Sequence, residues 1–158
     1  MKSSFGFTIL ELTIVIALVG ILSVMVMPKW LATSTNLNFE ARHLLNDIRY
    51  AQSLSLTTGE RYRLAKVSST TYRITEEDGT PIVLPNGGTS TTFATGIVFG
   101  TFGNLPNDLI AFSALGVPYS DTTLPGLALG VTGTIPITNG SQTVTLQITP
   151  QTGFGLIP

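Results

Sequence analysis

Residues 6–30 read Gly-Phe-Thr-Ile-Leu-Glu-Leu-Thr-Ile-Val-Ile-Ala-Leu-Val-Gly-Ile-Leu-Ser-Val-Met-Val-Met-Pro-Lys-Trp, and this stretch decides the fold. From Phe7 to Met27 every residue is apolar, glycine, serine or threonine, except Glu11. As an α-helix with a rise of about 1.5 Å per residue, this run spans about 30 Å, the thickness of a bilayer core. A charge near the bilayer centre costs about 2.5–3.5 kcal/mol, so Glu11 implies a partner or a function. Pro28 lacks a backbone donor and is predicted to kink or interrupt the helix.

A secretory signal peptide and a plain single-pass anchor are the simpler interpretations of this segment. A signal peptide carries about 7–15 apolar residues followed by small residues at the cleavage site. Here the apolar run is longer, and its end at residues 26–30 offers no such site. A plain anchor fits the length but leaves Glu11 unexplained.

Composition limits what the rest of the chain can do. Its 158 residues leave room for one soluble domain beyond the apolar segment, and only 11% of them are charged. The absence of cysteine excludes disulfides, thiol nucleophiles and cysteine-based metal sites. No Lys or Arg follows Arg73, so the second half of the chain has no cationic surface of its own.

The helical pattern resumes after Pro28. Apolar residues recur at spacings of three and four and predict one buried stripe on an amphipathic helix: Leu37, Ala41, Leu44, Leu45, Ile48 and Ala51. Gly59 is expected to cap this helix at its carboxyl end. His43, the single histidine, has no second His or Cys near it and is expected to be a surface or interface residue, not a metal ligand.

Beyond Gly59 the pattern changes to that of strands. Tyr62 and Leu64 alternate with polar residues, as do Tyr72 and Ile74, which predicts a hairpin with a turn at Ser68-Ser69. Further strands are expected in four stretches: residues 97–102, 109–112, 127–131, and 144–148 after an Asn139-Gly140 turn. The sequence therefore predicts an α+β fold, with a long amino-terminal helix packed against a carboxy-terminal antiparallel sheet.

The segment Gly6-Phe7-Thr8-Ile9-Leu10-Glu11, followed by the apolar run, resembles the class III signal of type IV pilins and pseudopilins. The resemblance implies that a prepilin peptidase cuts between Gly6 and Phe7 and that Phe7 is N-methylated. Glu11 and Pro28 match the glutamate and the proline of that family. The chain would then comprise a leader (1–6), a transmembrane and filament-core helix (7–28), an amphipathic helix (29–58) and a β-rich globular domain (59–158).

Cleavage gives Glu11 a partner. It frees an amine at Phe7, and Glu11 on a neighbouring helix can pair with that amine in a low-dielectric bundle. Removal of either group leaves an uncompensated buried charge. Glu11 is therefore expected to set the register between subunits.

Three further stretches narrow the resemblance. Residues 45–52 followed by Gly59, residues 110–118 and residues 144–153 are similar to the pseudopilin H and FimT-type minor pilin group. That group's closing glycine, here Gly153, is commonly followed by arginines, a feature linked to DNA binding. Residues 153–158 contain no cation, which puts a DNA-binding role in doubt.

No catalytic motif and no cofactor-binding motif is recognisable, and Glu76-Glu77-Asp78 lacks the spacing of a Ca²⁺ loop. Asn139-Gly140-Ser141 fits a glycosylation sequon, although a hairpin turn explains it adequately. Arg61, Arg63 and Arg73 are expected on one outer face of the hairpin. They form either a weak polyanion patch or, with the neighbouring glutamates, a salt-bridged surface or subunit contact.

The resemblance implies a structural, non-enzymatic subunit, a minor pilin or pseudopilin, of a type IV pilus or a type II secretion pseudopilus. Its expected partners are other pilin or pseudopilin subunits, the prepilin peptidase and the inner-membrane assembly platform. It would reside in the bacterial inner membrane with its carboxy-terminal domain in the periplasm, and then in the pilus or pseudopilus. The alternatives are a DNA-binding competence pilin and an anchored exported protein that does not assemble.

Overall fold

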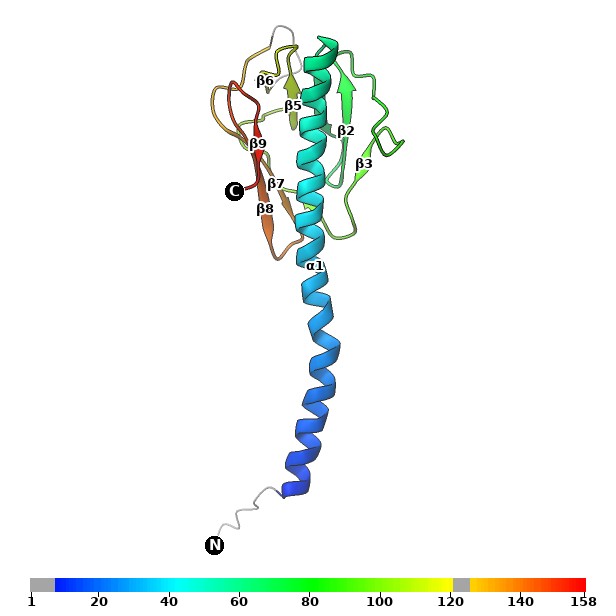
Figure 1. Ribbon diagram of the computed structural model, residues 1–158. Helices are drawn as coiled ribbons and strands as arrows, with labels where there is room; N and C mark the ends of the chain where they lie inside the picture. Colours follow the sequence, from blue (N-terminus) through cyan, green and yellow to red (C-terminus); the bar gives the residue numbers. More distant parts are fainter. Residues whose placement is uncertain (1–7, 121–125) are drawn as a thin grey trace. The chain divides into compact units, whose positions relative to one another are not determined.

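In the computed structural model, residues 8–120 and 126–158 are described, without the side chains of residues 24–35. Contacts divide the chain into two units, Met1–Thr35 and Asn36–Pro158, which are considered separately. One helix, α1 (Ile9–Thr58), begins in the first unit and ends in the second (Figure 1).

In the first unit, helix α1 begins with a side-chain cap. The hydroxyl oxygen of Thr8 accepts a hydrogen bond from the backbone N–H of Glu11 (3.2 Å), which satisfies one of the unpaired amides of the first turn. The helix continues through Pro28, so the proline does not end it, and a kink there stays a prediction. Within the described part of the chain, no helix is both long and apolar enough to cross a membrane. Residues 1–7, which comprise the predicted leader and cleavage site, lie outside the described residues.

In the second unit, helix α1 buries the predicted stripe. Its six apolar side chains, from Leu37 to Ala51, are all in the hydrophobic core, which confirms the helical periodicity. The amide of Gly59 donates to the carbonyl of Ser55 (3.1 Å), and Gly59 has a φ of 75°, which few residues other than glycine adopt readily. The predicted carboxyl cap is confirmed.

The strands form two antiparallel sheets instead of the single sheet expected. The five-stranded sheet has the order β3-β2-β1-β5-β6, and the four-stranded sheet has the order β4-β7-β8-β9. The bounds in the first sheet are β1 (Tyr62–Lys66), β2 (Thr71–Glu76), β3 (Thr91–Thr92), β5 (Leu109–Phe112) and β6 (Pro118–Tyr119). Those in the second sheet are β4 (Val98–Phe99), β7 (Gly133–Thr138), β8 (Thr143–Ile148) and β9 (Gly155–Leu156). Figure 1 shows β2 and β3 on one side of α1 and β8 and β9 on the other.

Several predicted strands are confirmed. Strands β1 and β2 pair with Leu64 opposite Ile74, and the inward residues Tyr62, Leu64, Tyr72 and Ile74 are buried. Strand β5 has the predicted bounds. Strand β8 follows the Asn139-Gly140 turn, in which the side-chain oxygen of Asn139 accepts hydrogen bonds from the amides of Ser141 and Gln142 (3.0 and 2.8 Å). The sequon asparagine therefore stabilises a hairpin turn.

Other strand predictions were wrong. Residues 127–131 form no strand, and the pairing found there is one isolated bridge at Ala128. The apolar residues at the two ends of this run are not buried, since Leu127 and Val131 are 75% and 58% exposed. The run at 97–102 contributes only the two-residue strand β4, although Ile97, Phe99 and Phe102 are buried. Strand β7 was missed because Pro136 lies in its middle, where proline is normally excluded. Its carbonyl still accepts a hydrogen bond from the amide of Gly100 (2.8 Å).

Helix α1 is tied to both sheets by polar groups as well as by its stripe. The hydroxyl of Ser55 lies within hydrogen-bond distance of the carbonyl of Phe112 in β5 (3.2 Å) and accepts from the amide of Tyr62 in β1 (3.2 Å). The side-chain amide of Gln52 donates to the carbonyls of Gly116 (2.9 Å) and Thr152 (2.7 Å). Gln52 thus joins the turn after β5 to the turn before β9, which brings together the three stretches that carry the minor pilin resemblance.

Gly153 lies at this junction, and its replacement by alanine is expected to destabilise the domain. Its φ is 66°, and an added Cβ would lie 2.7–2.9 Å from Gln52 Nε2, the carbonyl of Gly116 and the ring of Phe112. Left-handed strain and overpacking together predict a loss of about 2–4 kcal/mol. Thermal unfolding of the full-length protein in detergent, followed by circular dichroism, measures it.

Gly130→Ala is the matched control for this substitution. Gly130 has open space where the Cβ would lie, so its replacement is expected to leave the unfolding temperature nearly unchanged. Equal unfolding temperatures for the two variants would contradict the close packing at Gly153.

Candidate functional site

The first candidate region is the helical segment from Thr8 to Ser23, which we call the assembly segment. All its side chains are exposed, including large hydrophobic ones over its whole length: Ile9, Leu10, Leu12, Ile14, Val15, Ile16, Leu18, Val19, Ile21 and Leu22. The hydroxyls of Thr13 and Ser23 donate to carbonyls of their own helix and so need no outside partner. A contiguous apolar surface of this kind marks a site of protein–protein or membrane contact.

Glu11 is the one charged side chain of the assembly segment. It lies in the first turn of α1, where the positive end of the helix dipole favours an acid. Its carboxylate is exposed, and no ion pair to it occurs among the described residues. Gly6 and Phe7 lie outside the described residues, as does the side chain of Pro28, so the processing and assembly roles of these residues stay predictions.

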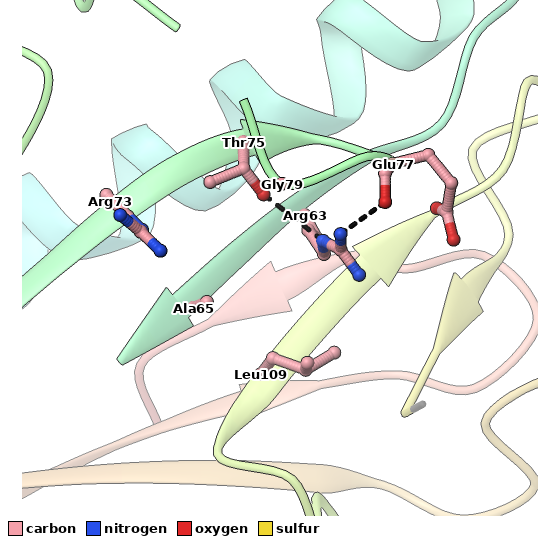
Figure 2. Close-up of a pocket in the computed structure, with 7 residues that line it drawn as sticks. All are labelled: Arg63, Ala65, Arg73, Thr75, Glu77, Gly79 and Leu109. Carbon is pink, nitrogen blue, oxygen red and sulfur yellow. Dashed lines mark hydrogen bonds between the residues drawn. The ribbon is translucent and has the colours of Figure 1, made fainter. Parts of the chain in front are cut away.

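Two of the three arginines of the predicted patch, Arg63 and Arg73, lie together on the outer face of the β1–β2 hairpin (Figure 2). Arg63, Arg73, Thr75, Glu77 and Leu109 line a hollow of about 410 Å³, together with Ala65 and Gly79. The guanidinium of Arg63 donates to the hydroxyl of Thr75 (3.1 Å) and to the carbonyl of Glu77. Arg73 is exposed, and no hydrogen bond or ion pair to its side chain is found among the described residues.

Arg61 does not share this hollow. Its side chain is only 8% exposed, its Nε faces Glu77 Oε2 at 3.2 Å, and its guanidinium lies over the ring of Tyr119 (4.6 Å to the centroid). Two of the three predicted arginines are therefore engaged within the domain, and Arg73 alone of the three extends into solvent.

A polar network between helix α1 and strand β2 was not predicted. The buried hydroxyl of Tyr72 donates to Asp47 Oδ2 (2.7 Å), and His43 Nδ1 lies 3.2 Å from the same hydroxyl. Burial, and then the neighbouring Asp47 carboxylate, raise the pKa of Tyr72 far above its ordinary value. His43, partly exposed, is thus an interface residue of the helix, as expected.

Both acids in this half of α1 are held toward the sheets. Asp47 accepts from Tyr72, and Glu40 Oε1 accepts a hydrogen bond from the backbone amide of Ala94 (3.1 Å). The two arginines of the same half, Arg42 and Arg49, are exposed. The acids of this helix half therefore bond to the sheet side, whereas both of its arginines are exposed at the surface.

The helix arginines border a groove beside the carboxy-terminal residues. We call it the arginine groove, and its lining residues are Asn38, Arg42, Leu45, Arg49, Leu156, Ile157 and Pro158. Its volume is about 450 Å³. Arg49 donates to the carbonyl of Gly155 (3.0 Å) and lies over the ring of Phe154 (5.6 Å). Residues 153–158 contain no cation, but Arg49 of the helix places a guanidinium beside Phe154 and Gly155.

Sequence reasoning missed this groove because its parts are more than a hundred residues apart. The one local signal was that Arg42 and Arg49 are two helical turns apart and so share a face. In the described part of the chain, no group of three or more His, Asp or Glu side chains is placed to hold a metal ion.

Two crystal structures of the type IV minor pilin FimU from Pseudomonas aeruginosa are similar to this structure. One matches with a TM-score of 0.56 and 15% sequence identity, over 81% of this chain and 92% of FimU. The other, in a second crystal form, matches with a TM-score of 0.56 and 16% identity, over 77% and 92%. The chain has a type IV pilin fold. No model of a known protein family matches the sequence, and neither does any curated protein sequence.

The pilin fold confirms the α+β prediction made from the helix stripe and the strand pattern. At this level of identity the likeness concerns the fold alone, and what the protein does rests on its own residues. In this pilin fold those residues form the assembly segment, the hollow lined by Arg63 and Arg73, and the arginine groove.

Tyr72→Phe is expected to destabilise the domain by about 1–3 kcal/mol, because Asp47 loses a charge-assisted hydrogen bond. The pH dependence is also predicted. Folded Tyr72 keeps its proton at a pH where the unfolded chain, with a pKa of about 10, loses it. The wild-type protein therefore loses this stabilisation as the pH rises above about 10, and Tyr72→Phe removes that part of the fall.

Urea unfolding at several pH values measures both effects. Tyr50→Phe is the control, since Tyr50 is also partly buried but donates no described hydrogen bond. If the free energy of unfolding of Tyr72→Phe fell above about pH 10 as steeply as that of the wild-type protein, Tyr72 would not be responsible for the fall.

Proposed function

We propose that this protein is a non-enzymatic structural subunit of a bacterial type IV pilus or a related pseudopilus, of the minor pilin kind. One observation carries the proposal: a chain with the pilin fold bears a long exposed apolar helix with a single carboxylate in its first turn. Such a helix needs apolar surroundings, and a filament core of similar helices supplies them.

Burial of the assembly segment provides the cohesion of the assembly. Each large apolar side chain moved from water into a packed core contributes about 1.5–3 kcal/mol. The assembly segment exposes such side chains around its whole circumference, so several neighbouring helices can cover it at once. The same surface suits a bilayer before assembly, and the protein would be held in the inner membrane through residues 7–28.

Glu11 then sets the position of each helix in the bundle. Cleavage between Gly6 and Phe7 removes residues 1–6 and leaves an N-methylated ammonium on Phe7. The carboxylate of Glu11 on one subunit pairs with this ammonium on the next, so that neither charge stays uncompensated in the apolar core. Since Thr13 and Ser23 bond within their own helix, Glu11 is the polar side chain of the assembly segment that requires a partner.

Processing and assembly of this kind require further protein partners. A prepilin peptidase would cut the leader, and an inner-membrane platform would extract the subunit. The β-rich domain would face the periplasm and then the outside of the filament. The convergence of the three motif stretches on Gln52 supports the minor pilin group, because residues far apart in the sequence share one packing function.

The DNA-binding alternative receives less support. Arg61 and Arg63 have partners within the domain, and the tail after Gly153 adds no cation. Nonspecific DNA binding depends on several phosphate contacts from cations. Arg73 by itself would give weak, strongly salt-dependent binding.

Mass spectrometry of the protein purified from its own host tests the processing step. The expected amino terminus is N-methylated Phe7, with residues 1–6 removed. An intact Met1 terminus in cells with an active prepilin peptidase would support the alternative of a permanently anchored protein.

Glu11→Gln is expected to leave cleavage intact and to reduce the amount of this subunit in sheared surface filaments, because the ammonium of Phe7 loses its counter-charge. Immunoblots of filament and membrane fractions measure it. Ser23→Ala is the control in the same helix, since the Ser23 hydroxyl bonds only to its own backbone. Equal incorporation of both variants would rule out the register role of Glu11.

A further inference from the structure

The arginine groove has the features of a docking surface. It combines apolar lining residues, Leu45, Leu156, Ile157 and Pro158, with the side chains of Arg42 and Arg49. Arg42 is exposed and has no hydrogen bond or ion pair within the described residues. No carboxylate side chain lines the groove, because Glu40 and Asp47 are held on the sheet side of the helix. An acidic partner with an apolar margin is the chemistry that fits such a groove.

The same chain carries a complementary surface at the end of β2. A tight turn there, closed by hydrogen bonds from Gly79 to the carbonyl of Glu76 and from Glu76 to the carbonyl of Thr80, exposes Asp78. We call residues 76–80 the acidic turn. Glu60 and Arg61 lie beside it, so four carboxylates and one guanidinium line this surface.

The acidic turn is also preorganised. Asp78 accepts hydrogen bonds from the amide (2.8 Å) and the hydroxyl (3.0 Å) of Thr80. These bonds, the backbone one first, hold the pKa of Asp78 below its ordinary value, so the turn stays anionic at any physiological pH. A rigid charged turn loses little conformational entropy when it docks.

The two surfaces do not meet within one subunit. The arginine groove lies beside β9 and the acidic turn follows β2, and these strands are on opposite sides of α1 (Figure 1). A contact between two different surfaces of identical chains is heterologous, and it continues from subunit to subunit in an open assembly where the rotation between subunits does not close a ring.

We propose that the arginine groove binds the acidic turn of a second copy of this chain, so that the globular domains make a lateral contact in addition to the helix core. This inference rests on the proposed filament role, which it extends to a specific contact. A second copy is favoured over a nucleic acid because four of the seven residues that line the groove are apolar and because the complementary acids are present on the chain itself.

Because the chain has no cysteine, cross-linking between copies can report this contact without background. One tagged full-length copy carries Asn46→Cys, on the exposed helix face between Arg42 and Arg49, and a second copy with another tag carries Pro81→Cys, at the exposed residue that follows the acidic turn. Both are expressed together in the host and treated with a short bismaleimide. The expected result is a mixed dimer. Ser141→Cys, in the exposed β7–β8 turn, replaces Asn46→Cys as the control and is expected to give no dimer.

Arg42→Gln, added to the Asn46→Cys copy, tests whether the charge of Arg42 contributes to the contact. It is expected to lower the mixed dimer by about two- to fivefold, the range for an exposed ion pair. Adding Arg73→Gln instead is expected to change nothing, because Arg73 lies on the outer face of the hairpin.

Three outcomes would overturn the contact: no mixed dimer, an equal dimer with Ser141→Cys, or Arg42-dependent retardation of DNA without any dimer. The last of these would assign the groove to a polyanion. The filament fraction of the same cells separates this failure from that of the pilin role. If uncross-linked copies are present in sheared filaments, the pilin role stands without the contact; if the wild-type chain is absent from them, both fail.

Discussion

The apolar stripe of helix α1 is the surface on which the rest of the domain depends. Two sheets, neither of which can bury a face alone, close against one helix, and residues from both belong to one core. Leu45 lies against Gly155 of β9, and Ser55 bonds to β5 and to the start of β1. Both sheets therefore pack against the same helix. The direction in which the stripe of the helix faces fixes where both sheets lie.

That direction also sorts the charges. When the stripe faces the sheets, Glu40 and Asp47 fall at its border and find a backbone amide and the Tyr72 hydroxyl. Arg42 and Arg49 are then exposed on another face, at whose edge Arg49 reaches the carbonyl of Gly155 in β9. A charge pattern that looks balanced along the sequence becomes separated in space, and the exposed face of the helix is cationic for this reason.

The parts of the fold that follow from local periodicity could be predicted. The stripe, the Gly59 cap, the β1–β2 hairpin and the strand after Asn139-Gly140 each depend on residues that are close in the sequence. Strand β7 could not be predicted, because the proline in its middle argues against a strand in the sequence. Its pairing with β4 and β8, which accommodates Pro136, is visible only in the structure. The arginine groove and the Tyr72–Asp47 contact join residues that are far apart, and no pattern in a single chain reveals such pairs. The β1–β2 hairpin shows the converse: the shared face of Arg63 and Arg73 follows from alternation, but the hydrogen bonds of Arg63 to the Thr75 hydroxyl and the Glu77 carbonyl depend on how the turn after β2 folds.

Gln52 has a consequence for how this domain tolerates change. One side-chain amide holds two turns that are widely separated along the chain, so neither turn can shift unless the other shifts with it. Insertions and sequence drift in those turns are coupled, and an epitope placed in either would disturb the other. The β7–β8 tip at residues 139–142 bears no such tether, since its hydrogen bonds are all local. It is the natural position for a visible tag on this subunit.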